Sequence, residues 1–325
     1  MLAMVLRGLA LLALLLSGLP GNAALAADYP VRPIHWIVPY PPGGTTDVLA
    51  RDVAQAVAQA LGQPIVIDNR GGAGGQLAMN AVAKATPDGY TLLVSDASLA
   101  TAPSLYRQLS FDPVKDLQAV ARFATVAHIV VVNPQNPAKS LGELIALSKR
   151  APGSLNFGSG GVGSPLHLAG EALRMESAMA WTHIPYKGAA AAILAVIGNE
   201  VQVATPSLPA ALGFVQAGQL RALAVMSPQR LAVLPDVPTV AELGYPKATV
   251  QGWVGLHAPA GTPAPVVSIL ETAVTVALQD AALRERLAGQ GADIAVQSGP
   301  AYAAFVADEA RRWKLVVEAA GIEQQ

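Results

Sequence analysis

The sequence contains no cysteine among its 325 residues. This absence excludes disulfides, thiolate metal sites, cysteine nucleophiles and a lipid anchor on an N-terminal cysteine. Charged residues are also scarce, at 13%, and 21 lysines and arginines stand against 22 aspartates and glutamates. Nucleic acids and anionic membranes attract clustered positive charge, so neither is an expected partner of this chain.

Motifs for nucleotide cofactors and for metals are missing as well. The Gly-Lys-Ser and Gly-Lys-Thr tripeptides of a P-loop do not occur, and the glycine-rich loops do not match the dinucleotide fingerprint. The five histidines lie far apart and lack the spacing of metal ligands. We therefore expect neither a cofactor nor a metal.

The N-terminus has the order typical of a secretory signal peptide. Arg7 precedes an apolar run at residues 9–16, and small residues follow as far as Ala27. This run is too short to span about 30 Å of hydrocarbon. We predict that residues 1–26 form a signal peptide, and that cleavage near Ala26 leaves an exported, soluble protein in the periplasm.

The rest of the chain alternates short β-rich runs with alanine-rich helical runs, which is typical of an α/β fold with largely parallel sheets. A helix over residues 47–61 is predicted because Leu49, Val53 and Val57 recur on one face. Ser140 and Glu143 have capping-box spacing and predict another helix start. Strands are expected at residues 34–38, 64–68, 90–95, 120–132, 155–158, 181–185, 201–205, 220–226 and 250–257, and further helices at 76–84, 165–176, 189–197, from 262, at 281–289 and at 299–320.

Two stretches of this alternation predict two lobes around a ligand cleft. A chain of this length usually divides into more than one core. We assign residues 27–127 and 249–325 to lobe 1 and residues 128–248 to lobe 2. In such sheets, ligands bind beyond the carboxyl ends of the strands, where loops meet helix N-termini.

Three glycine-rich loops occupy that position, at residues 39–47, 70–75 and 158–164. Glycine lets backbone amides approach a ligand closely, and a helix start adds unpaired N–H donors. Each loop alone is more typical of a tight turn, but three in equivalent positions indicate an anion site shared by both lobes. The rigid turn at residues 183–188, which contains Tyr186, is a fourth candidate.

At these segments the sequence resembles the Bug receptors, the periplasmic solute-binding proteins of tripartite tricarboxylate transporters. The resemblance runs from about Tyr29 to Glu318. It implies an α/β, two-lobed type II periplasmic binding protein, a Venus flytrap with its ligand cleft between the lobes. The segments that carry it are residues 37–47, 68–75, 87–93, 156–164 with His167, 185–188, 234–242 and 253–263.

The resemblance also implies that a small organic carboxylate is captured by lobe closure and held by backbone amides, hydroxyls and water. The expected partner is either the membrane permease subunits or a periplasmic sensor domain, and the protein is expected to be a monomer. The site residues it implies are Tyr40, Pro41, Gly43, Gly44, Thr45 and Asp47 in the first loop, Ser95, Asp96 and Ala97 after the third strand, and Ser159, Gly160, Ser164, His167, Tyr186 and Thr205 in the other lobe.

One segment departs from the family pattern. Gln202 and Pro206 stand where acidic or otherwise polar side chains are common in the Bug receptors. Burying an ammonium group without an opposing charge costs several kcal/mol. This departure therefore favours a carboxylate without an amino group over the amino acid of matching size.

An exported hydrolase on the same scaffold is the alternative function, with Ser159 or Ser164 as nucleophile and His167 as base. The residues around Ser159 do not form a nucleophile elbow, and no acid is evident that would orient His167. We therefore predict a binding protein rather than an enzyme.

Overall fold

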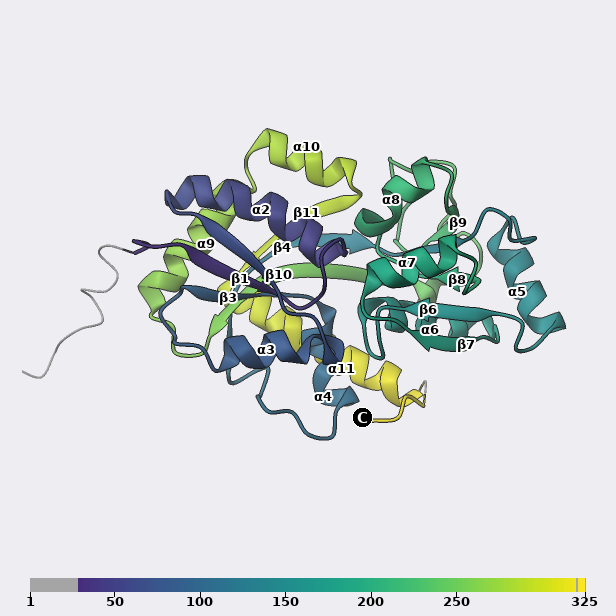
Figure 1. Cartoon of the computed structure of the whole chain (residues 1–325), viewed down its shortest axis with the longest axis horizontal. Helices are drawn as coiled ribbons and strands as arrows, with labels where there is room; N and C mark the ends of the chain where they lie inside the picture. The colour runs from purple at the N-terminus through teal and green to yellow at the C-terminus, as the bar shows by residue number, and fades with distance from the viewer. Residues whose placement is uncertain (1–28, 320, 325) are drawn as a thin grey trace, which may run out of the picture.

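The computed structural model describes residues 29–319 and 321–324. Its chain forms two α/β lobes, each built on one sheet, and the two sheets lie side by side in Figure 1. This two-lobed arrangement confirms the predicted fold class. The predicted signal peptide lies outside the described residues.

The first lobe contains a six-stranded sheet with the order β11-β4-β10-β3-β1-β2. Strand β1 pairs in parallel with β2 and β3, so the carboxyl ends of these three strands lie at one edge of the sheet. Strand β10 is antiparallel to both β3 and β4. The strands are β1 (Ile34–Val38), β2 (Ile65–Asn69), β3 (Thr91–Ser95), β4 (Leu117–Ala127), β10 (Gln251–Pro259) and β11 (Ala292–Ser298).

Helices cover both faces of this sheet. In α2, the side chains of Leu49, Val53 and Val57 are fully buried, which confirms the predicted apolar face. The helix begins at Thr45, two residues before the predicted start. One face carries α2 (Thr45–Leu61), α9 (Ala264–Ala277) and α10 (Ala281–Gly289), and the other carries α3 (Gln76–Ala83), α4 (Ala97–Leu105) and α11 (Gly299–Ala319).

The second lobe contains a five-stranded sheet with the order β7-β6-β8-β5-β9. Strand β6 is parallel to β7 and β8. Ser140 caps α5 by accepting a hydrogen bond from the backbone N–H of Glu143, as its spacing predicted. The elements are β5 (Ile129–Val132), β6 (Asn156–Ser159), β7 (Thr182–Pro185), β8 (Val203–Ala204), β9 (Arg221–Val225), α5 (Leu141–Arg150), α6 (Pro165–Ser177), α7 (Ala189–Ile197) and α8 (Leu208–Gln216).

The chain crosses between the sheets at His128. This single buried residue separates β4 from β5, so the extended run predicted at residues 120–132 is two strands in two different sheets. The Nδ1 atom of His128 lies 2.9 Å from the carbonyl oxygen of Thr205. The strands of each sheet fall within one of the two predicted lobes. The exact residues at which one lobe ends and the other begins stay a prediction.

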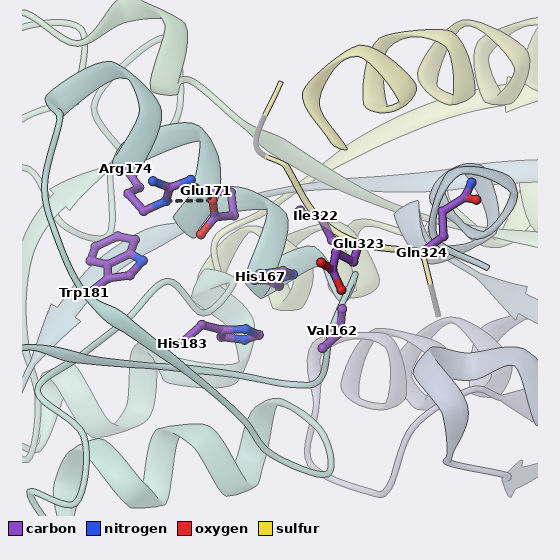
Figure 2. A pocket seen from close by; sticks show the side chains of 9 residues that line it. All are labelled: Val162, His167, Glu171, Arg174, Trp181, His183, Ile322, Glu323 and Gln324. Atoms are coloured by element: carbon purple, nitrogen blue, oxygen red, sulfur yellow. Dashed lines mark hydrogen bonds and ion pairs between the residues drawn. The ribbon is translucent and has the colours of Figure 1, made fainter. Parts of the chain in front are cut away.

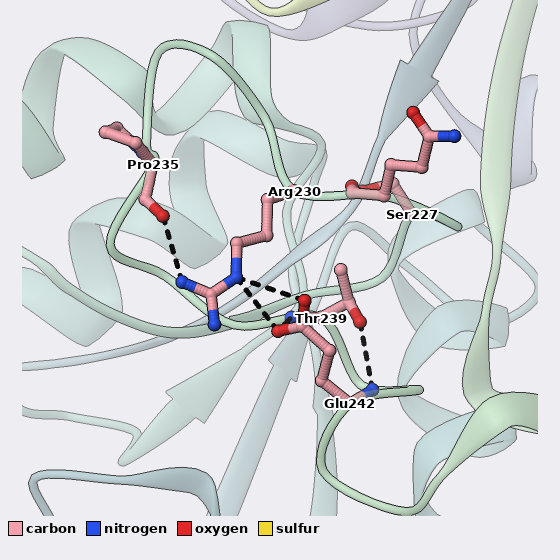
Figure 3. A network of polar contacts seen from close by, with 6 residues as sticks. Ser227, Arg230, Pro235, Thr239 and Glu242 are labelled. Carbon is pink, nitrogen blue, oxygen red and sulfur yellow. Dashed lines mark hydrogen bonds and ion pairs between the residues drawn. The ribbon is translucent and has the colours of Figure 1, made fainter.

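Polar contacts hold the long connection that leads back from β9 to β10 (Figure 3). Arg230 binds Glu242 at 2.9 Å and donates a second hydrogen bond to the carbonyl oxygen of Pro235. Thr239 and Glu242 cap each other through side-chain to backbone hydrogen bonds. This connection therefore has an ordered course although it contains only one regular element, the short 3-10 helix η3 (Pro246–Ala248).

Two α-helices and one strand of the described chain have no counterpart in the sequence-based prediction: α4, α8 and β11. Helix α4 contains Pro103, and almost all of its side chains are buried, so it has no one-sided apolar pattern. Helix α8 is apolar around most of its circumference, which hides the helical period. Both helices begin at the cleft, so missing them concealed part of the site.

No single helix within residues 29–319 is both long and apolar enough to cross a bilayer. Helices α9 and α10 reach the required length and hydropathy only as a pair bent by 74°. The apolar side chains of both helices pack with α2 in the core on one face of the six-stranded sheet. This packing accounts for the hydropathy of the two helices.

Candidate functional site

A small buried pocket lies where the two lobes meet, and we call it the inner pocket. It has a volume of about 40 Å³. None of the described residues that line it is basic, and Asp96 is its one charged member. The lining residues are Tyr40, Gly44, Thr45, Thr46, Asp96, Gly160, Ser164, Pro165, Leu166, Ala189 and Ser207.

Five helices begin at this pocket: α2 and α4 from the first lobe, and α6, α7 and α8 from the second. Asp96 caps α4 and Ser164 caps α6 with side-chain hydrogen bonds. The first turns of α2, α7 and α8 have no such cap. The free N–H groups of α2 and α7, together with the positive ends of the helix dipoles, make the inner pocket attractive to an anion. In α8, Pro209 has no N–H and that of Ala210 donates to the carbonyl oxygen of Ser207, so α8 contributes mainly the Ser207 hydroxyl.

One direct contact joins the lobes across the inner pocket. The hydroxyl groups of Thr45 at the start of α2 and Ser207 at the start of α8 form a hydrogen bond. Within the second lobe, Gly160 lies close to the start of α7, because a Cβ atom at this position would lie 3.1 Å from the backbone of Gly188 and Ala189. Glycine at this position therefore lets the third glycine loop pack against the start of α7.

Asp96 and Tyr40 form the polar floor of the inner pocket. Asp96 accepts hydrogen bonds from the backbone N–H of Ser98 at 2.9 Å and from the hydroxyl of Thr46 at 3.1 Å. Burial raises the pKa of Asp96, although these hydrogen bonds act against the shift. The buried hydroxyl of Tyr40 has no hydrogen-bond partner of good geometry, and burial together with the Asp96 charge raises the pKa of Tyr40.

A larger outer pocket of about 540 Å³ shares Tyr40 and Gly160 with the inner one. It brings together all three predicted glycine loops and the turn that contains Tyr186. Lys187 supplies a positive charge at this level of the cleft. The remaining lining residues are Pro41, Pro42, Asn69, Gly71, Gly72, Ala73, Gly74, Gly75, Gly161 and Gly188, of which Ala73–Gly75 form the short 3-10 helix η2.

Comparison with known proteins identifies the family of this chain. Residues 49–322 match the sequence pattern of the family described as "Tripartite tricarboxylate transporter family receptor". The chain belongs to this family. It is 40% identical over 302 residues to the protein BugT of Bordetella pertussis, and the alignment covers 92% of this chain and 93% of BugT.

Solved structures of similar proteins support the same assignment. A Rhodopseudomonas palustris structure with adipate is 33% identical and superposes with a TM-score of 0.89, covering 92% of this chain and all of the other. MatC from Rhodopseudomonas palustris with bound malate is 35% identical, with a TM-score of 0.85 and coverage of 89% of this chain and 100% of the other. The two-lobed fold of this tripartite tricarboxylate transporter receptor is thus shared with proteins that bind dicarboxylates.

The structure divides the predicted site residues of the receptor into two groups. Tyr40, Gly44, Thr45, Asp96, Gly160 and Ser164 line the inner pocket, and Pro41 and Tyr186 line the outer one. The others line neither pocket: Gly43, Asp47, Ser95, Ala97, Ser159, His167 and Thr205.

Asp47 holds the first loop instead of facing the cleft. Its carboxylate accepts hydrogen bonds from the backbone of Gly43 and from the side chains of Arg51 and Asn69. Burial opposes ionisation of Asp47, but these hydrogen bonds outweigh it and lower its pKa. Asn69 also donates to the carbonyl oxygen of Tyr40, so the first two glycine loops are tied together.

Ser95 and Thr205 also have structural partners. The Ser95 hydroxyl lies 2.7 Å from Nδ1 of His257 and 3.0 Å from the hydroxyl of Tyr302. Thr205 donates to the carbonyl oxygen of Leu166. Both hydroxyls are satisfied beneath the pocket walls.

His167 lines a different cavity, which we call the rear pocket, and Ser159 contacts His183 of the same lining (Figure 2). The Ser159 hydroxyl lies 2.6 Å from Nε2 of His183, and the rings of His167 and His183 stack at 3.9 Å. Nδ1 of His167 accepts the backbone N–H of Gly163, so this histidine supports the third glycine loop from behind. The rear pocket is lined by Val162, His167, Glu171, Arg174, Trp181, His183, Ile322, Glu323 and Gln324.

This geometry does not favour the alternative hydrolase. Ser164 caps α6 by accepting the backbone N–H of His167, so its hydroxyl does not meet the imidazole as a catalytic pair would require. Ser159 is fully buried, and no carboxylate in the described part of the chain forms a hydrogen bond with its partner His183. Residues 29–319 and 321–324 also contain no group of three acidic or histidine side chains that could hold a metal.

Two further expectations need correction. The side chain of Gln202 accepts the backbone N–H of Asn156 and lines neither the inner nor the outer pocket, so it does not face a ligand there. Sequence reasoning also missed Thr46, Leu166, Ala189 and Ser207 as lining residues. Ser207 precedes Leu-Pro-Ala-Ala, an N-cap signature for α8 that was available in the sequence.

Proposed function

We propose that this protein is a periplasmic receptor that captures a small organic carboxylate between its lobes for a tripartite tricarboxylate transporter. The observation that carries the proposal is the meeting of five helix N-termini at one buried pocket without a basic side chain among its described lining residues. Membership of the receptor family and the similar structures with adipate and malate support it.

Carboxylate binding in the inner pocket is proposed to rest on uncharged donors. The free N–H groups at the starts of α2 and α7 and the hydroxyls of Thr45 and Ser207 are the donors that this pocket offers. Hydrogen bonds to an ionised carboxylate are roughly twice as strong as those between neutral groups. The donors come from both lobes, so a carboxylate bound there would hold the lobes together.

Ligand entry is proposed to require separation of the lobes. A pocket of about 40 Å³ has room for a few water molecules at most, which is less than a dicarboxylate needs. The hydrogen bond between Thr45 and Ser207 would break as the cleft opens, and a ligand carboxylate would then replace it. The distal part of the ligand would lie in the outer pocket, near Tyr186 and Lys187.

We further propose that the protein acts after export, without catalysis, and delivers its ligand to membrane permease subunits. The family description names transporter receptors, which favours a permease over a sensor domain as the partner. From the predicted site, we propose Tyr40, Gly44, Thr45, Asp96, Gly160 and Ser164 as inner contacts, with Pro41 and Tyr186 as outer contacts.

A thermal-shift screen of the mature protein against monocarboxylates, dicarboxylates and tricarboxylates tests the proposal. A ligand that binds only the folded state at 100 times its Kd stabilises that state by about 2.7 kcal/mol. We expect at least one dicarboxylate, tested as succinate, malate and adipate, to raise the melting temperature in a saturable manner. No saturable shift with any carboxylate would contradict the proposed function.

A further inference from the structure

Asp96 is an unusual member of an anion-binding pocket. Its side chain is buried, with 4% of the residue exposed, and it lines the cavity at which the helix N-termini meet. A bare dicarboxylate in this pocket would lie next to a negative charge of the protein. The chemistry of the pocket therefore suits a ligand that presents more than carboxylate groups.

The charge of Asp96 has no cationic partner among residues 29–319. No lysine, arginine or histidine forms an ion pair with it within that range, and its bonded donors are Ser98 and Thr46. Asp47 at the end of the first loop differs in this respect, because a guanidinium nitrogen of Arg51 lies 2.9 Å from its carboxylate. A carboxylate offers about four acceptor positions, and the donors of Ser98 and Thr46 take three of them. The hydroxyl of Tyr40 lies against the same carboxylate, so a ligand ammonium group would take the place of this hydroxyl.

We propose that Asp96 selects ligands that carry an ammonium group next to a carboxylate, so that a small amino acid binds more tightly than the matching unsubstituted acid. This inference rests on the proposed function. The ammonium group would bind Asp96, while the ligand carboxylate would bind the free N–H groups of the facing helices. The sequence-based preference for an acid without an amino group relied on Gln202, which lies outside the inner pocket.

A purely structural role for Asp96 predicts a different result. Asp96 caps α4 through Ser98, and asparagine caps helices about as well as aspartate. An Asp96→Asn variant therefore keeps the cap but loses the charge. If Asp96 only caps α4, this variant should leave the ratio of affinities for charged and uncharged ligands unchanged.

The experiment is calorimetry with three ligand pairs: aspartate and succinate, glutamate and glutarate, and alanine and propionate. In the native protein, we expect the amino acid of the best-binding pair to bind at least about tenfold more tightly than its partner. Asp96→Asn should abolish or reverse that ratio. Asp280→Asn, which changes a capping aspartate at the start of α10, should retain it.

Each outcome decides between the two proposals. Tighter binding of succinate, glutarate or propionate by the native protein, or an unchanged ratio in Asp96→Asn, would overturn the role of Asp96 while leaving carboxylate capture intact. Binding of neither member of any pair would also overturn the selection of a small amino acid, whereas carboxylate capture itself is contradicted only when the thermal-shift screen gives no saturable shift with any carboxylate. The native protein alone supplies the first comparison, so the inference remains testable if the variant unfolds.

Discussion

The inner pocket and the rear pocket both border the third glycine loop, but they differ in their basic side chains. The rear pocket contains Arg174 and two histidines, yet Arg174 binds Glu171 at 2.7 Å and each imidazole has a hydrogen-bond partner (Figure 2). The inner pocket has no basic side chain among its described lining residues, but the starts of α2 and α7 have free N–H groups. Unsatisfied donors, rather than positive residues, therefore distinguish the proposed ligand site.

Acid should destabilise the protein through its buried neutral histidines, and this is the largest effect that we expect. Burial lowers the pKa of His167 and His257 to about 3 and that of His128 to about 4. The unfolded chain, with histidine pKa values near 6.5, binds more protons below that pH, so stability falls as the pH drops from about 6.5 towards 3. Urea unfolding between pH 7 and 4 should show a loss on the order of several kcal/mol.

The variant His167→Gln connects this effect to the rear pocket. It removes one of the three neutral histidines, so the stability of the variant should depend less steeply on pH by on the order of 2 kcal/mol over the same range. An unchanged pH dependence would show that His167 is not kept neutral by its burial behind the loop.

Filling the inner pocket should have the next largest effect. Gly44 lines the pocket, and with a φ of −81° it accepts a side chain without backbone strain, so Gly44→Val adds bulk where the carboxylate is proposed to bind. We expect affinity to fall about hundredfold, equivalent to about 2.7 kcal/mol. Calorimetry with the ligand found by the thermal-shift screen measures this loss.

Two arginine variants serve as controls for Gly44→Val. Arg70 binds Asp68 at the surface, and Arg174 lies in the rear pocket, so neither lines the proposed site. Arg70→Gln and Arg174→Gln should each change affinity by less than about twofold. A tenfold loss in either variant would show that side-chain charge matters for binding, and would remove the contrast between the two pockets.

Removing the contact between the lobes should have the smallest effect. Ser207→Ala deletes the hydroxyl that bonds to Thr45 and one proposed ligand donor, and a hydrogen bond of this kind contributes about 1 kcal/mol. We expect affinity to fall about fivefold, while Ser110→Ala, which loses only an exposed contact with Asn80, should bind normally. Unchanged affinity in Ser207→Ala would place the ligand away from the start of α8.

The amino-acid sequence by itself determined the fold class, the family and most of the regular elements. Strand β1 and the apolar face of α2 follow from patterns within a few residues, and the start of α5 follows from its capping box. These signals are local, because backbone hydrogen bonding and side-chain periodicity depend on neighbouring residues. The positions of the glycine loops, each between a strand and the start of a helix, likewise predicted the edge of the sheets at which the cleft lies.

Only the tertiary structure decided which residues of those loops face the cleft. Asp47 and Asp96 both follow strands of the first lobe, yet Arg51 and Asn69 bind one while the other lies in the inner pocket. Thr45 meets Ser207 across 162 positions of sequence. Such contacts depend on how the two lobes pack together, and no local pattern in the chain carries that information.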